Sequence, residues 1–222
     1  AGVDLDLAQL GASGGQLVDL PPYPFQRQRF WSDGVKGRAE ISSLGLEPLK
    51  HPWLGAVTNL AESDAKVFSG RLVAAEQRWV EDHRVHGLVL VPGTCILDLA
   101  FAAAHAVGAP TVSELTLAEP MLLSEPLCLQ VSVAAASEQG RRAFSIYSRP
   151  EGSEGPWTRH AVGSLSEHAP ADDADFARLA VWPVPGTEQV DQEGYYERAA
   201  AAGLEYGPAF RGLVELRRGQ PA

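Results

Sequence analysis

The sequence predicts an α+β fold in which a strongly bent antiparallel sheet encloses one apolar helix. Between residues 51 and 167, short alternating or apolar segments recur and are separated by Gly, Pro and Ser, a pattern typical of antiparallel strands. One helical segment, Thr94–Val107, interrupts this series and is apolar all round except at Asp98 and His105. Because a helix of this kind is normally buried, we expect the strands to wrap around it.

The predicted strands follow one another along the chain. Leu54–Leu60 and Lys66–Val73 are joined by the turn-like residues AESD, which indicates a hairpin, and Val85–Val91 is the last strand before the helix. Gly93 and Gly108 bound the helix. The strands predicted after the helix are Val112–Ala118, Leu127–Ala135, Ala143–Ser148 and Trp157–Leu165.

Two segments have the composition of linkers. Residues 1–50 are rich in Gly, Ser and Pro, and their cluster LPPYPFQRQRFW, from Leu20 to Trp31, favours an extended path that presses aromatic side chains onto a neighbouring surface. Residues 168–190 are acidic and contain prolines, which also predicts a linker. The strand-rich region at 51–167 therefore lies between two linkers.

A second structural unit is predicted after the second linker. Asp191–Ala202 is helical by composition, with Asp191 as the N-cap and Gly203 directly after its end. Leu213–Arg217 is the last predicted strand. We expect residues 191–222 to be only the start of this unit.

The composition excludes several classes of protein. The chain has 222 residues, with 18 Lys and Arg against 28 Asp and Glu, and its net charge of −10 argues against nucleic acids and anionic membranes as main partners. No apolar run approaches the roughly 20 residues of a membrane span, and no signal peptide opens the chain. Cys95 and Cys128 lack the CxxC spacing of a metal or redox site. We therefore expect no metal site and a reducing, cytoplasmic location.

The most informative segment is DHRVHGLVLVPG, in which His83, Gly87 and Pro92 have the spacing HxxxGxxxxP. The cluster LPPYPFQRQRFW and the motif HPWLG at 51–55 precede it, and YGPAFRG at 206–212 follows it. These four motifs, in this order and over nearly the whole chain, resemble the dehydratase domains of modular type I polyketide synthases. The first motif resembles the end of the linker that follows the acyltransferase domain in those synthases.

The resemblance implies a double hot-dog fold, in which each of two tandem units wraps a curved antiparallel sheet around a central helix. Residues 51–167 would be the first unit. The family removes water from a 3-hydroxyacyl thioester and gives a trans-2-enoyl thioester, using a His of the first unit and an Asp of the second. His83 matches that His, and imidazole accepts protons near neutral pH. The amide of Gly93, at the start of the helix, is suited to stabilise the thioester oxygen as an oxyanion.

Other residues of the motifs have supporting roles. The candidates for lining the substrate pocket or positioning the acid are Pro92, Tyr206 and Phe210. The Tyr206 hydroxyl has three open roles, since it is able to hydrogen-bond the acid, the substrate or a loop. The residues interpreted as structural parts of the motifs are Gly87, Gly207 and Pro208.

Three further residues near His83 have side chains that could take part in chemistry: His86, Cys95 and Asp98. His86 has no third metal ligand at suitable spacing, and we interpret it as structural. Cys95 is interpreted as a small apolar residue. Asp98 lies five residues after Gly93 and matches the helix carboxylate of related single hot-dog dehydratases. In a tandem domain this position faces a site without its His, so we interpret Asp98 as a vestigial acid; a symmetric pair of chains would instead bring it to His83 of the other chain.

The sequence departs from the family at the second catalytic residue. The family's Asp belongs to an HPxxxD-type motif well after YGPAF, and the 222 residues contain no such motif there. Either the sequence is a piece of a longer domain, or the natural protein carries a degenerate dehydratase. The rival hypotheses are a non-catalytic scaffold domain, and a dehydratase that also isomerises, epimerises or cyclises its product.

The resemblance also implies partners. The substrate would be carried on the phosphopantetheine arm of an acyl carrier protein, with no cofactor in the domain itself. Acyltransferase and ketoreductase domains would be neighbours, and the synthase would be a homodimer. Because both the chain and carrier proteins are acidic, docking requires a local basic patch. The candidates for that patch are Arg27, Arg29, Arg211, Arg217 and Arg218.

Overall fold

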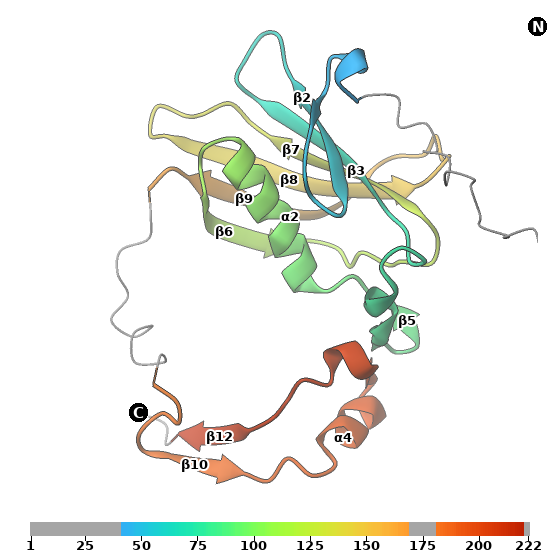
Figure 1. Cartoon of the computed structure of the whole chain (residues 1–222), viewed down its shortest axis with the longest axis vertical. Helices are drawn as coiled ribbons and strands as arrows, with labels where there is room; N and C mark the ends of the chain where they lie inside the picture. The colour runs from blue at the N-terminus through green and yellow to red at the C-terminus, as the bar shows by residue number, and fades with distance from the viewer. Residues whose placement is uncertain (1–40, 169–180, 220–222) are drawn as a thin grey trace, which may run out of the picture. The chain divides into compact units, whose positions relative to one another are not determined.

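The computed structural model describes residues 41–168 and 181–219. Its largest element is a seven-stranded antiparallel sheet with the strand order β1-β2-β3-β7-β8-β9-β6 (Figure 1). In that order the strands are β1 (Glu47–Pro48), β2 (Leu54–Asn59), β3 (Lys66–Leu72), β7 (Leu127–Val133), β8 (Arg141–Pro150), β9 (Thr158–Ser166) and β6 (Thr111–Leu117). A 3-10 turn, η1 (Ile41–Leu44), precedes the sheet. The predicted α+β class and the hairpin of β2 with β3 are both confirmed.

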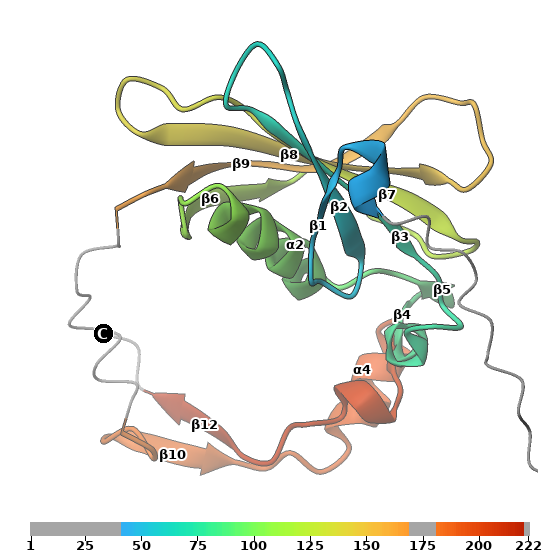
Figure 2. The ribbon, with the colours of Figure 1, turned by 45° about the horizontal axis from the view of Figure 1, so that its top comes forward.

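Alternating side chains build the core. In β7, every second residue from Leu127 to Val133 is buried, and β8 alternates in the same way around Phe144 and Ile146. The α-helix α2 (Gly93–Ala106) lies against one face of this sheet (Figure 2). Its buried residues are Cys95, Ile96, Leu99, Ala100, Ala103 and Ala104. Three of these are alanines, whose small side chains allow the helix backbone to approach the strands closely.

The helix α2 matches the predicted segment to within one residue at each end. Its burial is confined to one side. Thr94, Asp98, Phe101 and His105 are all exposed, and they recur every three or four residues, so they form one stripe along the helix. Among the described residues the sheet covers only one side of α2, so the helix is buried on that side and exposed along this stripe.

The segment predicted as one strand at Val85–Val91 is a small hairpin instead. It contains β4 (His83–Val85) and β5 (Leu88–Val89). Between them, His86 and Gly87 have φ angles of 49° and 76°. Two successive residues with positive φ make the tight turn whose twist matches paired strands. The sequence has no signal for a turn at this point, because the residues around it are mostly apolar and a His rarely adopts a positive φ.

The C-terminal elements begin later than predicted. The helix α4 (Tyr195–Ala201) starts after Gly194, which has φ 67°, whereas Asp191 accepts a hydrogen bond from the Glu193 amide at 2.8 Å and so caps a turn before the helix. The strand β12 (Leu216–Gly219) pairs with β10 (Thr187–Val190), and β11 (Leu204–Tyr206) pairs with β4. β10 lies in the last residues of the segment that was predicted to be a linker.

The predicted aromatic cluster from Leu20 to Trp31 lies outside the described residues, as does most of the N-terminal linker. The described helices are all too short, or not apolar enough, to cross a membrane.

An ion pair ties two turns of the sheet together. Asp64, in the turn between β2 and β3, accepts a hydrogen bond from the guanidinium of the buried Arg142 and another from the Ala136 amide at 3.3 Å. Arg142 also donates to the backbone oxygens of Asp64 and Ala134, at 3.2 and 3.4 Å. The hydrogen bond from Arg142 is the main cause that lowers the pKa of Asp64 below its ordinary value of 3.8.

We expect Asp64→Asn to lower the melting temperature of the chain at pH 7 by a few degrees, since it removes the charge that faces Arg142. A carboxyl with a lowered pKa in the folded state contributes stability above its ordinary pKa and loses it as the pH falls through the folded value. The difference between wild type and Asp64→Asn should therefore be constant from pH 7 to 5 and shrink between about pH 4 and 2. Thermal melts across this range measure it, and a constant difference down to pH 2 would contradict the assignment.

Candidate functional site

His83 is positioned by the end of a 3-10 turn and the start of a strand. The turn η2 (Arg78–Asp82) leads directly into β4, whose first residue is His83. The His83 Nδ1 lies 2.8 Å from the Leu90 carbonyl oxygen, and the Leu90 amide donates to the His83 carbonyl at 3.1 Å. Because a carbonyl only accepts hydrogen bonds, Nδ1 carries the ring proton. Nε2 therefore presents a lone pair, and it has no hydrogen-bond partner among residues 41–168 and 181–219.

Two aromatic side chains from the YGPAF motif pack on this imidazole. The register of β11 with β4 places Tyr206 opposite His83, and their ring centroids are 5.4 Å apart. Phe210 lies at 5.0 Å from the His83 ring and at 6.0 Å from Tyr206. The structure thus brings together His83, Tyr206 and Phe210, which the sequence analysis had singled out separately. The Tyr206 hydroxyl makes no hydrogen bond within the described part of the chain.

Asp82 fastens this motif beside His83. The Asp82 carbonyl accepts a hydrogen bond from the Gly207 amide at 2.8 Å, and its carboxylate accepts one from the Ala209 amide at 2.9 Å. A Cβ atom at Gly207 would lie 2.3 Å from the Asp82 Oδ1, so only glycine fits there. Pro208 then begins the 3-10 turn η3 (Pro208–Phe210), which directs Phe210 at the imidazole. Asp82 was not among the predicted site residues, and its position next to His83 is its one signal in the sequence.

The start of α2 forms a second part of the site. Pro92 is buried and caps the helix, whose first residue is the exposed Gly93. The first amides of a helix have no partner within the helix and carry its positive dipole end, so they suit a developing negative charge. Gly93 also borders a cavity of about 310 Å³ with a mainly apolar lining. The cavity is lined by Leu90, Val91, Gly93, Ile96, Leu117, Ala118, Glu119, Pro120 and Met121.

His86, Gly87 and His105 take part in turns or backbone hydrogen bonds. The His86 amide donates to the Gly203 carbonyl at 2.7 Å, which joins the β4–β5 turn to the start of β11. Gly87 occupies that turn with positive φ. His105 Nδ1 lies 2.9 Å from the Phe101 carbonyl oxygen of its own helix. Within the described residues, no group of three or more His, Cys, Asp or Glu side chains forms a metal site.

Cys95 is a buried thiol on α2. Burial is the main cause that raises its pKa to about 11, and the nearby carboxylate of Asp98 adds to the effect. The thiol is therefore protonated at neutral pH and is a poor nucleophile. This agrees with its interpretation as a small apolar residue.

Asp98 has a histidine partner that the sequence analysis did not foresee. Its Oδ2 lies 3.0 Å from the Nε2 of His51, the first residue of the HPWLG motif. This histidine is not the His of the HxxxGxxxxP motif, so the vestigial role of Asp98 stays a prediction. Sequence reasoning had no means of pairing them, because His51 and Asp98 are 47 residues apart in the sequence and meet only in the folded chain.

A second histidine missed by the sequence analysis lies inside the sheet. His160 on β9 is 4% exposed, and its Nδ1 lies 3.0 Å from the Glu119 carbonyl oxygen. Its Nε2 lies 2.8 Å from the hydroxyl of Ser148 on β8, which is equally buried. Both ring nitrogens are thus occupied. The pair joins two strands and the loop after β6, and it has no access to a substrate.

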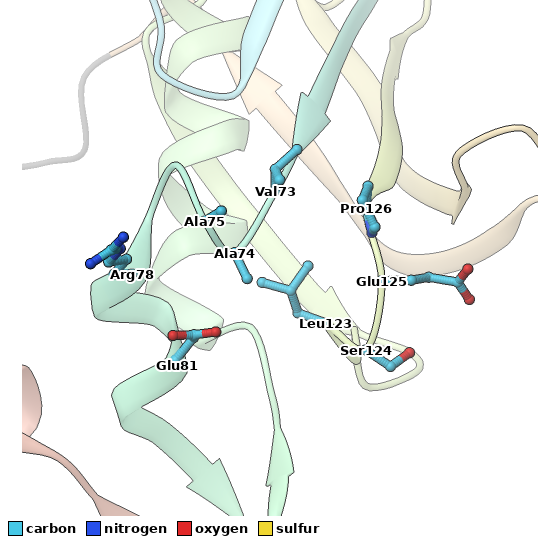
Figure 3. A pocket seen from close by; sticks show the side chains of 9 residues that line it. All are labelled: Val73, Ala74, Ala75, Arg78, Glu81, Leu123, Ser124, Glu125 and Pro126. Atoms are coloured by element: carbon cyan, nitrogen blue, oxygen red, sulfur yellow. The ribbon is translucent and has the colours of Figure 1, made fainter.

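A cavity of about 540 Å³ lies between η2 and the segment that precedes β7. Figure 3 shows the apolar side chains of Ala74 and Leu123 facing one another in it, with Arg78 and Glu125 directed away to opposite sides. Its lining is Val73, Ala74, Ala75, Arg78, Glu81, Leu123, Ser124, Glu125 and Pro126. None of the predicted site residues borders it, and it contains no histidine. This cavity therefore adds no residue to the candidate site around His83.

Comparisons with known families match most of this chain. Residues 51–149 match the family described as "Polyketide synthase dehydratase domain", and residues 174–221 match "Polyketide synthase dehydratase N-terminal domain". The first match contains His83 and the start of α2. The second contains the whole YGPAF motif.

Relatives and solved structures agree with these matches. Polyketide synthase GfsA of Streptomyces halstedii is 44% identical over 98% of this chain, which spans 3% of that synthase. The dehydratase domain from the terminal module of the rifamycin polyketide synthase is 36% identical with a TM-score of 0.75, over 82% of this chain and 66% of that one. The erythromycin dehydratase is 33% identical with a TM-score of 0.74, over 82% and 67%. The hot-dog fold implied by the sequence motifs is confirmed.

We expect Asp82→Ala to loosen the turn that holds Phe210 against His83, because it removes the acceptor of the Ala209 amide. Hydrogen exchange of a peptide spanning residues 206–212, followed by mass spectrometry, should become about fivefold faster, as the loss of one hydrogen bond predicts. Asp82→Asn keeps an oxygen acceptor and is the matched control. Unchanged exchange in Asp82→Ala would contradict the role given to this carboxylate.

Proposed function

Because the chain belongs to the dehydratase domains of modular type I polyketide synthases, we propose that the domain carrying it removes water from a 3-hydroxyacyl thioester. The product is the trans-2-enoyl thioester. The single observation that best supports this proposal is the tautomer of His83, whose Nδ1–H is held by the Leu90 carbonyl at 2.8 Å. That bond leaves Nε2 as a base of fixed direction.

In the proposed reaction, the His83 Nε2 removes a proton from the carbon next to the thioester carbonyl. The electrons of this C–H bond form the new carbon–carbon double bond as the bond to the β-hydroxyl breaks. The Nδ1–H hydrogen bond stabilises the imidazolium that forms, since the carbonyl oxygen of Leu90 faces its positive charge. The rings of Tyr206 and Phe210 cover the imidazole and limit the access of water to it.

Negative charge develops on the thioester oxygen as the proton leaves. We assign the Gly93 amide as the donor for this oxygen, because it lies at the positive end of α2. The apolar cavity beside Gly93 has room for part of an acyl chain. Pro92 holds the amide in place by starting the helix, and Gly87 shapes the turn between His83 and the helix.

The leaving hydroxide needs a proton to depart as water. The family's Asp supplies it, and the 222 residues contain no HPxxxD-type motif after YGPAF. The proposal therefore assigns the acid to a residue outside this sequence. The chain spans about two thirds of the solved dehydratases, which leaves a part of those domains unmatched. His83 then returns its proton to the acid, so one turnover releases one water and restores both groups.

The parts of the chain and the partners of the domain are assigned as follows from its family. We assign residues 1–50 to the linker after an acyltransferase domain, 51–167 to the first hot-dog unit, 168–190 to an inter-unit linker and 191–222 to the start of the second unit. The substrate is carried on the phosphopantetheine arm of an acyl carrier protein, in a cytoplasmic, dimeric synthase that has a ketoreductase. The reaction needs no cofactor, because base, oxyanion donor and acid suffice.

One arginine stands out among the candidates for carrier docking. Arg217 is paired with Glu215, and the Arg211 guanidinium donates to the Tyr206 carbonyl at 2.7 Å. Arg27 and Arg29 lie outside the described residues. Arg218 is exposed, and its side chain makes no hydrogen bond within the described part of the chain. We therefore assign Arg218 as the first contact for an acidic carrier protein.

The activity is tested with His83→Ala in the full dehydratase domain. Removal of the base should lower the rate of enoyl formation from a carrier-bound 3-hydroxyacyl substrate about 10²–10⁴-fold. His105→Ala is the matched control, since His105 is exposed on α2 and, among the residues that the structure describes, bonds only to its own helix. A His83→Ala domain that keeps more than about a tenth of the wild-type rate would refute the assignment.

Residues 1–222 alone should show no dehydratase activity, because a base without an acid leaves hydroxide as the leaving group. The check is an assay of the purified chain over a concentration series, beside Asp98→Asn. Activity that rises with the dimer population and disappears in Asp98→Asn would contradict this expectation. It would show that Asp98 serves as the acid for His83 of a second chain.

A further inference from the structure

A histidine and a carboxylate that the proposed reaction does not use meet just before β2. The Nδ1 of His51 accepts hydrogen bonds from the Trp53 and Leu54 amides at 3.1 and 3.2 Å. The ring proton is therefore on Nε2, which donates to the Asp98 Oδ2 at 3.0 Å. With both ring nitrogens occupied, His51 is no base. It fixes the segment before β2 against the helix α2.

The exposure of the two side chains indicates how much this contact contributes to the stability of the fold. The His51 side chain is 10% exposed and that of Asp98 is 70% exposed. Ion pairs with an exposed partner contribute little to the stability of a fold. The contact is directional, however, because the tautomer of His51 is set by two backbone amides. It is thus better suited to fix a position than to hold the fold together.

A series of stacked rings leads from this contact to the base. Trp53 is buried and stacks on Trp79, with centroids 6.1 Å apart and planes at 16°. Trp79 stacks on Phe210 at 6.1 Å, and Phe210 lies at 5.0 Å from His83. Trp79 also belongs to η2, the turn that ends directly before His83. Displacement of Trp53 therefore reaches the imidazole by two routes, through the rings and through the backbone.

An adjacent cavity gives the rings room to move. It has a volume of about 290 Å³ and is lined by His51, Pro52, Trp53, Gln77, Trp79, Thr94, Cys95 and Asp98. Trp79 is 44% exposed. A ring that borders empty space lacks contacts on that side, so packing alone does not fix its orientation. A directional contact beside the cavity supplies the missing constraint.

We propose that the hydrogen bond between His51 and Asp98 is a latch that keeps Trp53 stacked on Trp79 and, through Phe210, orients the His83 imidazole. His51 and Asp98 are then positioning residues for the dehydration. This inference rests on the proposed function, and it gives Asp98 a use in place of the vestigial one.

The test uses the full dehydratase domain with Asp98→Ala, which removes the acceptor of the latch. The kcat for a carrier-bound 3-hydroxyacyl substrate should fall about tenfold while KM changes less than about twofold, because the base is misplaced but the substrate still binds. The near-ultraviolet circular dichroism of the stacked tryptophan pair should weaken in parallel. His51→Asn should show the same losses, since its shorter amide still accepts from the Trp53 amide but does not reach Asp98.

Two variants serve as controls. Asp98→Asn keeps an oxygen that accepts from the His51 Nε2–H, so it should keep kcat and the tryptophan signal within about twofold of wild type. Glu151→Ala breaks another exposed ion pair, with Arg71 at 2.8 Å, and should change neither quantity.

The outcomes separate the latch from its alternatives. A wild-type kcat in Asp98→Ala would overturn the latch. An inactive Asp98→Asn with an intact tryptophan signal would also overturn it, because the carboxylate would then act in the chemistry itself. A wild-type domain without dehydratase activity would refute the proposed function instead; in that case an unchanged tryptophan signal in Asp98→Ala would still overturn the latch.

Discussion

The short pairing of β11 with β4 is the constraint on which the candidate site depends. It joins two segments that are far apart in the sequence, and its register places Tyr206 opposite His83. Asp82, directly before β4, extends the pairing by holding the Gly207 and Ala209 amides. Without these few contacts His83 would lack its aromatic cover. The large sheet supports the fold, and the small sheet brings the candidate site residues His83 and Tyr206 together.

The helix α2 links that small sheet to the core. Its buried face of small and apolar side chains anchors it on the large sheet, and its first residue, Gly93, follows the loop whose Leu90 carbonyl fixes the tautomer of His83. The proposed base and the proposed oxyanion donor therefore belong to one continuous stretch of chain. Further along the helix, Asp98 binds His51 on the exposed stripe. One helix thus carries the proposed oxyanion donor, Gly93, at its start and the proposed latch residue, Asp98, five residues further on.

Much of the fold was predictable from the sequence, because local patterns determine it. Alternation in β7 and the apolar run of α2 each reflect burial on a nearby surface, and both segments were found almost to the residue. The turn at His86 was not predictable, since its positive φ is stabilised by a bond to Gly203, far along the chain. In the candidate site, the resemblance to family motifs singled out His83, Tyr206 and Phe210, whose rings lie together in the structure. Contacts between distant segments, such as that of His51 with Asp98, were not predictable, because they produce no local pattern in the sequence.

The origin of the site in two segments has a consequence for rebuilding such synthases by recombination. A crossover placed between β9 and β10, where the sequence has the composition of a linker, would join a His83 from one parent to a YGPAF motif from another. The β4–β11 register, the close approach of Gly207 to Asp82 and the ring stack would then have to match across lineages. Crossovers that keep residues 51–212 from a single parent avoid that mismatch, so the unit of exchange that preserves the candidate site is larger than the predicted first hot-dog unit.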